Sequence, residues 1–154
     1  MKKLMLLLLT ILVFGACKES EEPLQDAFVF GRWSAFCTGN CIQIYKLEND
    51  KLYVDNLNSF REAATITYKP TPLSNQYVAK AKSLRDSFPQ SLLENPFSVI
   101  GCPDCADQGG IYLAFDNREG TLYWQIDADE TTWPEVIRPY LEELTEFIDQ
   151  LPQD

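Results

Sequence analysis

Two segments with alternating side chains, joined by a turn, constrain the fold of this chain most strongly. Apolar residues alternate with their neighbours over residues 111–115 and again over residues 122–126. Between them, residues 117–120 read Asn-Arg-Glu-Gly, a composition typical of a turn. A period of two is that of a β-strand, whose successive side chains point to opposite faces. The pattern therefore predicts a β-hairpin over residues 111–126.

Shorter segments nearer the N-terminus have the same period. Residues 42–47 alternate, and residues 52–54 return after a polar turn, which predicts a second hairpin. Residues 31–36 and 65–68 are rich in aromatic and β-branched side chains, and we expect a strand in each.

Two segments have the period of an amphipathic helix. We expect a helix over residues 74–88, with Ser74 as its N-cap and an apolar stripe formed by Tyr77, Ala81, Leu84 and Phe88. A second helix is expected from about Pro134, with a stripe formed by Ile137, Tyr140, Leu141, Leu144, Phe147, Ile148 and Leu151. Pro139 is expected either to kink this helix or to mark its true start.

Hairpins combined with one helix in the middle and one at the end are typical of an α+β fold. We expect an antiparallel sheet of about five or six strands, with one central and one C-terminal helix packed on it. The expected organisation has residues 1–16 as a cleaved signal peptide, residues 17–26 as an acidic tether and residues 27–154 as a single domain.

The N-terminal segment has the order of a secretory signal. Lys2-Lys3 precede an apolar run from Leu4 to Phe14, and the small residues Gly15-Ala16 stand directly before Cys17. The run is shorter than the roughly 20 residues that span a bilayer, so we expect a signal rather than an anchor. A cysteine directly after a small pair resembles the lipobox of bacterial lipoproteins, and this resemblance implies acylation of the Cys17 thiol. The alternative is an ordinary signal peptide with an incidental cysteine.

The residues after Cys17 are polar and acidic. Residues 18–25 read KESEEPLQ, which predicts a flexible tether. The sequence C-K-E-S-E-E at residues 17–22 resembles the acidic signal that directs some lipoproteins of the Bacteroidota to the outer face of the outer membrane. The resemblance implies a protein of the bacterial outer membrane, periplasmic or surface-exposed, that is held to the membrane through acyl chains on Cys17.

The charge of the chain restricts its partners. It carries 13 Lys and Arg against 23 Asp and Glu, for a net charge of −10. Loss of Lys2 and Lys3 with the leader would change the net charge to −12. Such a surface repels nucleic acid and anionic lipid, so we expect no nucleic-acid partner. It favours encounter with a basic envelope or exported protein, or simply keeps the protein soluble.

The absence of histidine restricts the chemistry. It excludes Ser-His-Asp and Cys-His sites and every His-ligated metal. We therefore expect a non-enzymatic binding or interaction module of the bacterial cell envelope, with no catalytic residue, no metal and no cofactor. Two alternatives stay open. One is a hydrolase of envelope glycans acting through a pair of carboxylates drawn from Asp104, Asp107 and the cluster of Asp127, Asp129 and Glu130. The simpler role expected for that cluster is to cap the start of the final helix. The other alternative is a zinc-stabilised domain.

Four cysteines stand in two pairs, Cys37 with Cys41 and Cys102 with Cys105. In an exported domain an even number of cysteines indicates disulfides, either within each pair or between the pairs. A zinc site with four thiolates is the alternative. Cys102-Pro103-Asp104-Cys105 also resembles the C-P-x-C sequence of glutaredoxins. Asp104 and the glycines at residues 109–110 disfavour a reactive thiolate at a helix N-terminus.

Two further sets of residues are candidates for ligand binding. Asp104, Asp107 and Gln108, beside the glycines at residues 109–110, form a possible ligand loop for a small cation or a polar molecule. The tryptophans could stack on sugars, although core packing is the expected role of at least the first two of Trp33, Trp124 and Trp133.

Two motifs of the chain resemble a known group of proteins. They are C-T-G-N-C-I-Q-I-Y-K-L at residues 37–47 and G-C-P-D-C-A-D-Q-G-G-I-Y-L at residues 101–113. The chain resembles small Bacteroidota lipoproteins of uncharacterised activity over much of residues 30–150. The resemblance supports the lipoprotein assignment and implies no particular activity.

Overall fold

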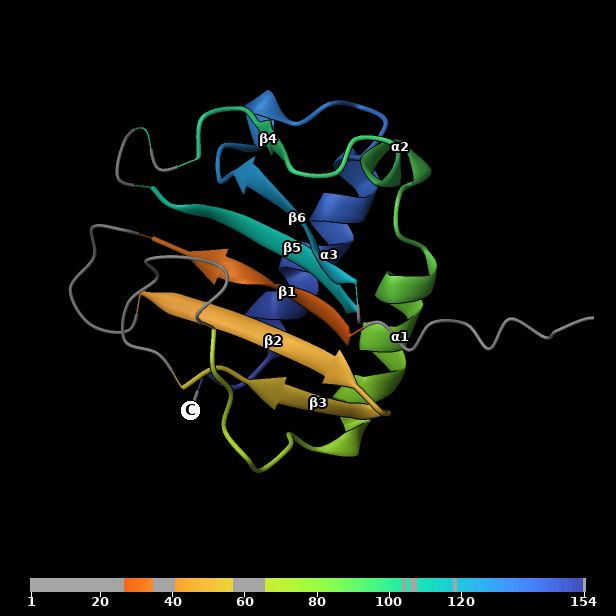
Figure 1. Ribbon diagram of the computed structural model, residues 1–154. Helices are drawn as coiled ribbons and strands as arrows, with labels where there is room; N and C mark the ends of the chain where they lie inside the picture. Colours follow the sequence, from red (N-terminus) through yellow and green to blue (C-terminus); the bar gives the residue numbers. More distant parts are fainter. Residues whose placement is uncertain are drawn as a thin grey trace, which may run out of the picture.

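The structure is a computed structural model that describes residues 27–34, 41–56, 66–103, 105, 108–117 and 119–153. Its strands are β1 (Ala27–Trp33), β2 (Ile42–Glu48), β3 (Lys51–Val54), β4 (Ser98–Ile100), β5 (Gly110–Asn117) and β6 (Gly120–Asp127). Its helices are α1 (Val78–Asp86), α2 (Gln90–Leu93) and α3 (Arg138–Gln150), with short 3-10 helices η2 (Asn75–Tyr77) and η3 (Glu130–Thr132). The chain has the expected α+β fold, with α1 and α3 on one face of a single sheet (Figure 1).

The sheet has six strands and is mostly antiparallel, as expected, with one parallel pair at its edge. The strand order is β3-β2-β1-β5-β6-β4, and β4 pairs with β6 in parallel while the other neighbours are antiparallel. The chain reverses between β4 and β5 and again between β5 and β6, so β4 and β6 run in the same direction. The segment that forms β4 is only three residues long and has no visible alternation, so it was not predicted as a strand.

Both predicted hairpins are confirmed. In the β2–β3 hairpin, Glu48 lies opposite Lys51. Asn49 and Asp50, between them, both have positive φ, as a tight two-residue turn requires. In the β5–β6 hairpin, Asn117 lies opposite Gly120 and its side chain accepts a hydrogen bond from the Gly120 N–H. The expected strand at residues 65–68 is wrong for its described part. Tyr68 forms only an isolated bridge with Asp55, and Thr65 lies outside the described residues.

The helix boundaries differ from the prediction in detail. The last helix begins at Arg138 rather than near Pro134, so Pro139 marks its start and does not kink it. Proline fits the first turn because the N–H that it lacks would have no partner there. The central helix begins as 3-10 turn η2, and the Ser74 side chain makes no cap hydrogen bond. No helix within the described ranges is both long and apolar enough to cross a membrane.

The main core lies between the sheet and the two long helices. Every residue of the stripe predicted for the last helix is buried, with exposed fractions between 0% and 8%. From the sheet, Phe28 and Phe30 of β1 face this core, and their rings lie 5.2 Å apart. The opposite face of the sheet has a smaller cluster of Val29, Ile42, Ile44, Tyr112 and Ala114. The alternation of β1 therefore supplies both faces of the sheet, as its central place requires.

Candidate functional site

The ends of neighbouring strands bring together residues that are far apart in the sequence. Trp33, at the end of β1, lies opposite Gly110, at the start of β5, and Gly110 lies opposite Asp127, at the end of β6. Ile100, at the end of β4, lies opposite Ile126. The loop between β4 and β5 therefore begins and ends where these strands end, and it carries the second cysteine pair.

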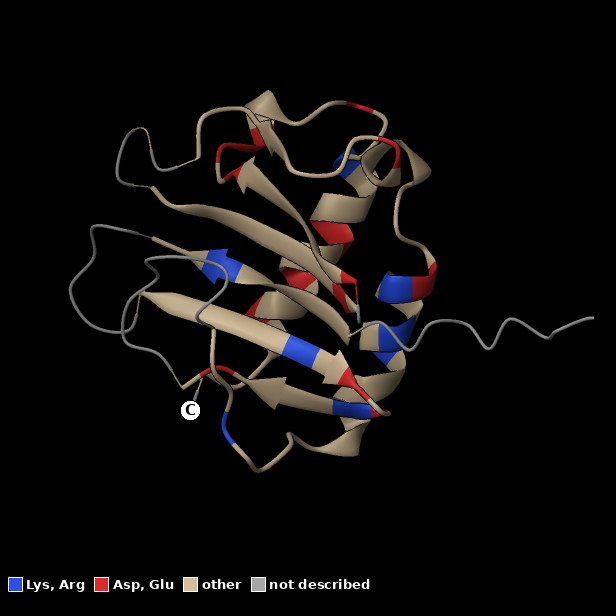
Figure 2. Ribbon diagram, in the orientation of Figure 1, with Lys and Arg blue, Asp and Glu red and all other residues tan. Residues whose placement is uncertain are grey.

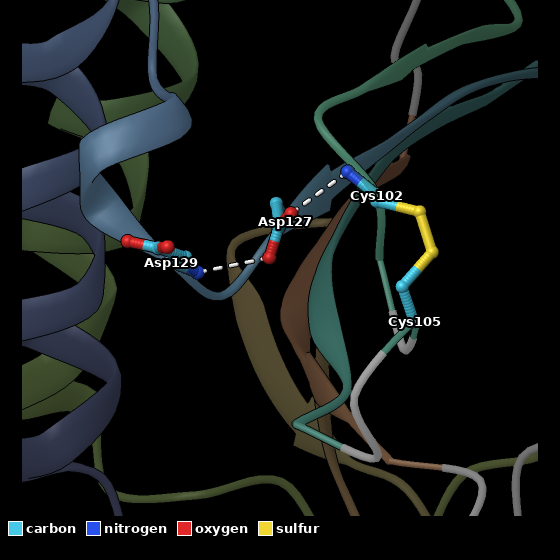
Figure 3. The surroundings of a disulfide bond; sticks show 4 residues. All are labelled: Cys102, Cys105, Asp127 and Asp129. Atoms are coloured by element: carbon cyan, nitrogen blue, oxygen red, sulfur yellow. Dashed lines mark hydrogen bonds between the residues drawn. A yellow bond between two sulfur atoms is a disulfide. The ribbon is translucent and has the colours of Figure 1, made fainter.

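Cys102 and Cys105 form a disulfide within this loop (Figure 3). Their Cα atoms are 5.5 Å apart, an ordinary distance for a disulfide, and the Cys105 N–H donates to the Cys102 carbonyl. Both residues are exposed. Because they are bonded to each other, the alternative of bridges between the two pairs is wrong. Cys41 is also disulfide-bonded, and Cys37 lies outside the described residues.

Removal of this disulfide is expected to have a modest effect on stability. The ring that it closes is small, and the loop-entropy relation assigns about 2 kcal/mol to such a ring. The Cys102→Ala/Cys105→Ala variant should therefore lose about 2 kcal/mol of unfolding free energy, measured by urea denaturation. The control is Gln108→Ala, an exposed position in the same loop, with an expected change below about 0.5 kcal/mol. A loss above about 4 kcal/mol in the double variant would contradict this local role.

Asp127 holds the loop to the end of β6. Its carboxylate accepts hydrogen bonds from the backbone N–H of Cys102 at 2.7 Å and of Asp129 at 3.0 Å (Figure 3). The backbone passes close here, since a Cβ on Gly101 would lie 2.6 Å from the Asp127 Cβ, and Gly101 has a φ of +73°. Asp127 is buried, so these bonds satisfy a carboxylate that would otherwise be costly to bury.

Asp129 has a different local role. Its carboxylate accepts hydrogen bonds from the hydroxyl and the backbone N–H of Thr131. These bonds hold the pKa of Asp129 below its usual value. Asp129 thus caps η3, whereas the sequence suggested that acids in this region cap the final helix. Of the five acids considered for carboxylate catalysis, Asp127 and Asp129 have these structural partners and Glu130 is exposed, whereas Asp104 and Asp107 lie outside the described residues.

The predicted ligand loop is described only in part. Asp104 and Asp107 lie outside the described residues, and Gln108 is exposed. Gln108 borders two hollows at this end of the sheet. The smaller, of about 120 Å³, is lined by the disulfide together with Asp127 and Asp129.

The larger hollow at Gln108 has a volume of about 270 Å³. Trp33 and Trp133 contribute to its lining, together with the polar residues Arg32, Gln108 and Glu130. Trp133 is buried and Trp33 is half-buried, whereas Gln108 and Glu130 are exposed. The lining thus combines aromatic surface with a few convergent polar groups, which is the usual composition of a small-molecule site.

Residues from α3 and η3 are fixed around this hollow by hydrogen bonds. The Arg32 guanidinium pairs with the Asp149 carboxylate and donates to the Thr145 carbonyl at 3.3 Å, which ties β1 to α3. Arg138 donates to the carbonyls of Glu130 and Trp133. The Trp133 indole N–H donates to the Asp127 carbonyl at 2.8 Å. The walls are therefore held by elements from both ends of the chain.

The outcome for the tryptophans differs from the expectation at one position. Trp124 is fully buried in the core, as expected, but Trp33 is only half-buried and lines the larger hollow. Arg32 was not predicted as a site residue, whereas Glu130 belongs to the acid cluster that was considered for carboxylate chemistry. A signal for Arg32 is present in the sequence, because a charge interrupts the core-facing positions of Phe28 and Phe30 at residue 32.

A metal centre is not assembled by the described part of the chain, where no group of three or more Cys, Asp or Glu side chains could hold an ion. Cys102 and Cys105, as a disulfide, are not thiolate ligands.

Comparison with known proteins does not identify the site. No protein-family model, curated protein or solved structure matches the chain significantly.

Proposed function

We propose that this chain is a lipid-anchored, non-enzymatic binding module of the bacterial cell envelope. The observation that carries the proposal is the Cys102–Cys105 disulfide, because disulfides persist in oxidising compartments outside the cytosol. The leader-like order of residues 1–17 would deliver the domain to such a compartment. The two features are independent of each other and favour the same location.

Acylation of Cys17 would attach the domain to a membrane. Each buried methylene of an acyl chain contributes about 0.8 kcal/mol, so two or more chains hold a protein stably. Residues 17–26 would reach at most about 35 Å when fully extended. The domain would therefore sit close to the membrane, with freedom to meet a ligand on its surface or in the surrounding solvent.

The charge of the domain is consistent with a module that does not lie flat on anionic lipid. Acidic residues are spread over the segment after β6, the exposed side of α3 and several turns (Figure 2). Because they are not gathered on one face, general repulsion of polyanions is better supported than one acidic docking patch for a basic protein.

The site that we assign to ligand binding is the 270 Å³ hollow at the end of β1. Most of its walls come from strands, η3 and α3, which are more precise supports than loops, and Gln108 adds a side chain from the loop between β4 and β5. Asp127 and Asp129 are engaged by backbone N–H groups, so the described carboxylates favour a structural role over the hydrolase alternative.

Labelling with a fatty acid tests the anchor. Cells that express the full chain and are fed a clickable alkyne fatty acid should yield labelled protein, and Cys17→Ala should abolish the label because the acyl acceptor is lost. Ser20→Ala, in the expected tether, is the matched control and should keep the label. Unlabelled wild-type protein with its leader still attached, or full labelling of Cys17→Ala, would refute the anchor.

A further inference from the structure

We infer that the hollow lined by Arg32, Trp33, Gln108, Glu130 and Trp133 binds one neutral sugar ring. The inference rests on the proposed binding function and specifies its ligand. It combines the size of the hollow, its aromatic surface, its unused polar groups and its balance of charge.

The size of the hollow limits the ligand to about one ring. Its volume of about 270 Å³ lies just below the range of roughly 300–1,000 Å³ typical of pockets for drug-sized molecules. Gly110 is part of the lining, and a Cβ at that position would lie 2.7 Å from the Ile126 carbonyl oxygen and 3.1 Å from the Pro103 Cβ. The backbone is therefore closely packed at this border of the hollow.

The aromatic surface suits the apolar face of a sugar. Trp33 is half-buried and Trp133 is almost fully buried, and both residues line the hollow. The face of an indole carries partial negative charge, which attracts the weakly positive C–H groups of a pyranose ring. An aromatic ring is also rigid, so little conformational entropy is lost when a ligand stacks on it.

The polar groups suit hydroxyls. Within the described ranges, no hydrogen-bond partner is found for the side chains of Gln108 and Glu130. A carboxylate accepts and an amide both donates and accepts, so together they match the mixed donors and acceptors of neighbouring hydroxyls. Arg32 keeps further N–H groups beyond those that bind Asp149 and Thr145, and its guanidinium is already fixed in place.

The charge balance favours a neutral ligand. The lining contains one cation, Arg32, and one anion, Glu130, and Arg32 is also paired with Asp149. An anionic ligand would meet the carboxylate of Glu130 and the net charge of −10 of the whole chain. The Arg32 guanidinium and the Asp149 carboxylate offset each other, so a cationic ligand would have only the exposed Glu130 carboxylate as a partner in the lining. A polyhydroxylated ring without charge avoids the repulsion of an anion and uses all the polar groups present.

Titration with simple sugars tests the inference. The full chain is purified in a detergent without a sugar headgroup and titrated with the methyl glycosides of glucose, galactose, mannose and N-acetylglucosamine. Saturation-transfer NMR and tryptophan fluorescence report binding. We expect at least one glycoside to bind, with a dissociation constant raised at least tenfold by Trp33→Leu and at least fivefold by Glu130→Gln.

Matched variants distinguish binding in this hollow from binding elsewhere on the protein. Glu135→Gln removes a nearby exposed carboxylate outside the hollow and should leave the affinity unchanged. If Trp33→Leu does not fold, Glu130→Gln and Gln108→Ala, both at exposed positions, carry the test alone. Binding of all the variants with wild-type affinity would refute the assignment to this hollow.

The sugar site and the lipid anchor can be refuted separately. Failure of all four glycosides to bind overturns the inference, and so does binding of choline in their place. In either case fatty-acid labelling at Cys17 would still support an envelope module with another ligand. Sugar binding by a protein without acylation would instead support the hollow and refute the anchor.

Discussion

Replacement of Trp124 by alanine is expected to lower the free energy of unfolding by about 4 kcal/mol. Trp124 is fully buried in β6, and its ring packs against Phe88, with centroids 4.9 Å apart, and against Phe115. Its indole N–H donates to the carbonyls of Leu92 and Asn95, both at 3.0 Å. The substitution would leave a cavity in the core and remove a donor from both carbonyls, of which that of Leu92 still accepts from the Asn95 N–H.

Trp124→Phe separates these two contributions. It keeps an aromatic ring but removes the N–H donor, so we expect a smaller loss of about 2 kcal/mol. Guanidinium denaturation followed by far-UV circular dichroism measures both variants. A loss below about 1 kcal/mol for Trp124→Ala would show that Trp124 does not hold β6 and α2 together as the structure has it. Folded domains have unfolding free energies of about 5–15 kcal/mol. The stability of Trp124→Ala should therefore still be measurable, or the variant should be only just unfolded.

Replacement of Gly31 by alanine is expected to cost about 3 kcal/mol. Gly31 lies in the middle of β1, opposite Ile44 of β2 and Tyr112 of β5. A Cβ on Gly31 would lie 2.6 Å from the Ile44 Cα and still closer to the Gln43 carbonyl oxygen. Both atoms belong to the backbone of β2, which cannot move without disturbing its pairing with β1.

The same substitution should weaken ligand binding, since β1 carries Arg32 and Trp33 directly after Gly31. Gly120→Ala is the control, because a Cβ there would meet no heavy atom within 4 Å. Its φ of +141° still disfavours alanine, so we expect a loss of about 1 kcal/mol. Denaturant midpoints of the two variants provide the comparison. Equal losses of stability in the two variants would mean that the close approach of β1 and β2 does not restrict the side chain at residue 31.

Local patterns were sufficient for much of the fold. The alternation over residues 111–126 and the stripe ending at Leu151 predicted a hairpin and a helix that the structure contains. These patterns succeed because one buried face imposes its period on a long element. The pattern fails for β4, whose three residues pair with β6 only because two chain reversals bring them alongside it.

The site was less accessible to prediction. The sequence singled out the loop with Cys102, Cys105 and Gln108, and that loop does lie at the end of the sheet where the hollows are. Trp33 was expected in the core. An aromatic residue near the end of a strand has the same sequence pattern whether or not its side chain is covered by other parts of the protein. Arg32 and Glu130 lie 98 residues apart and share a hollow only through the packing of α3 and η3 on the strands.

The sequence by itself determined the two hairpins and the two long helices, the composition of the core stripes and the acidic, histidine-free character that restricts the chemistry. Only the tertiary structure decided that β4 runs parallel to β6, that Cys102 pairs with Cys105, and that two tryptophans border a hollow with Arg32. The physical reason is the distance along the chain over which each property acts. Period and charge act over neighbouring residues, whereas strand order, cysteine partners and pocket walls depend on contacts between residues distant in the chain.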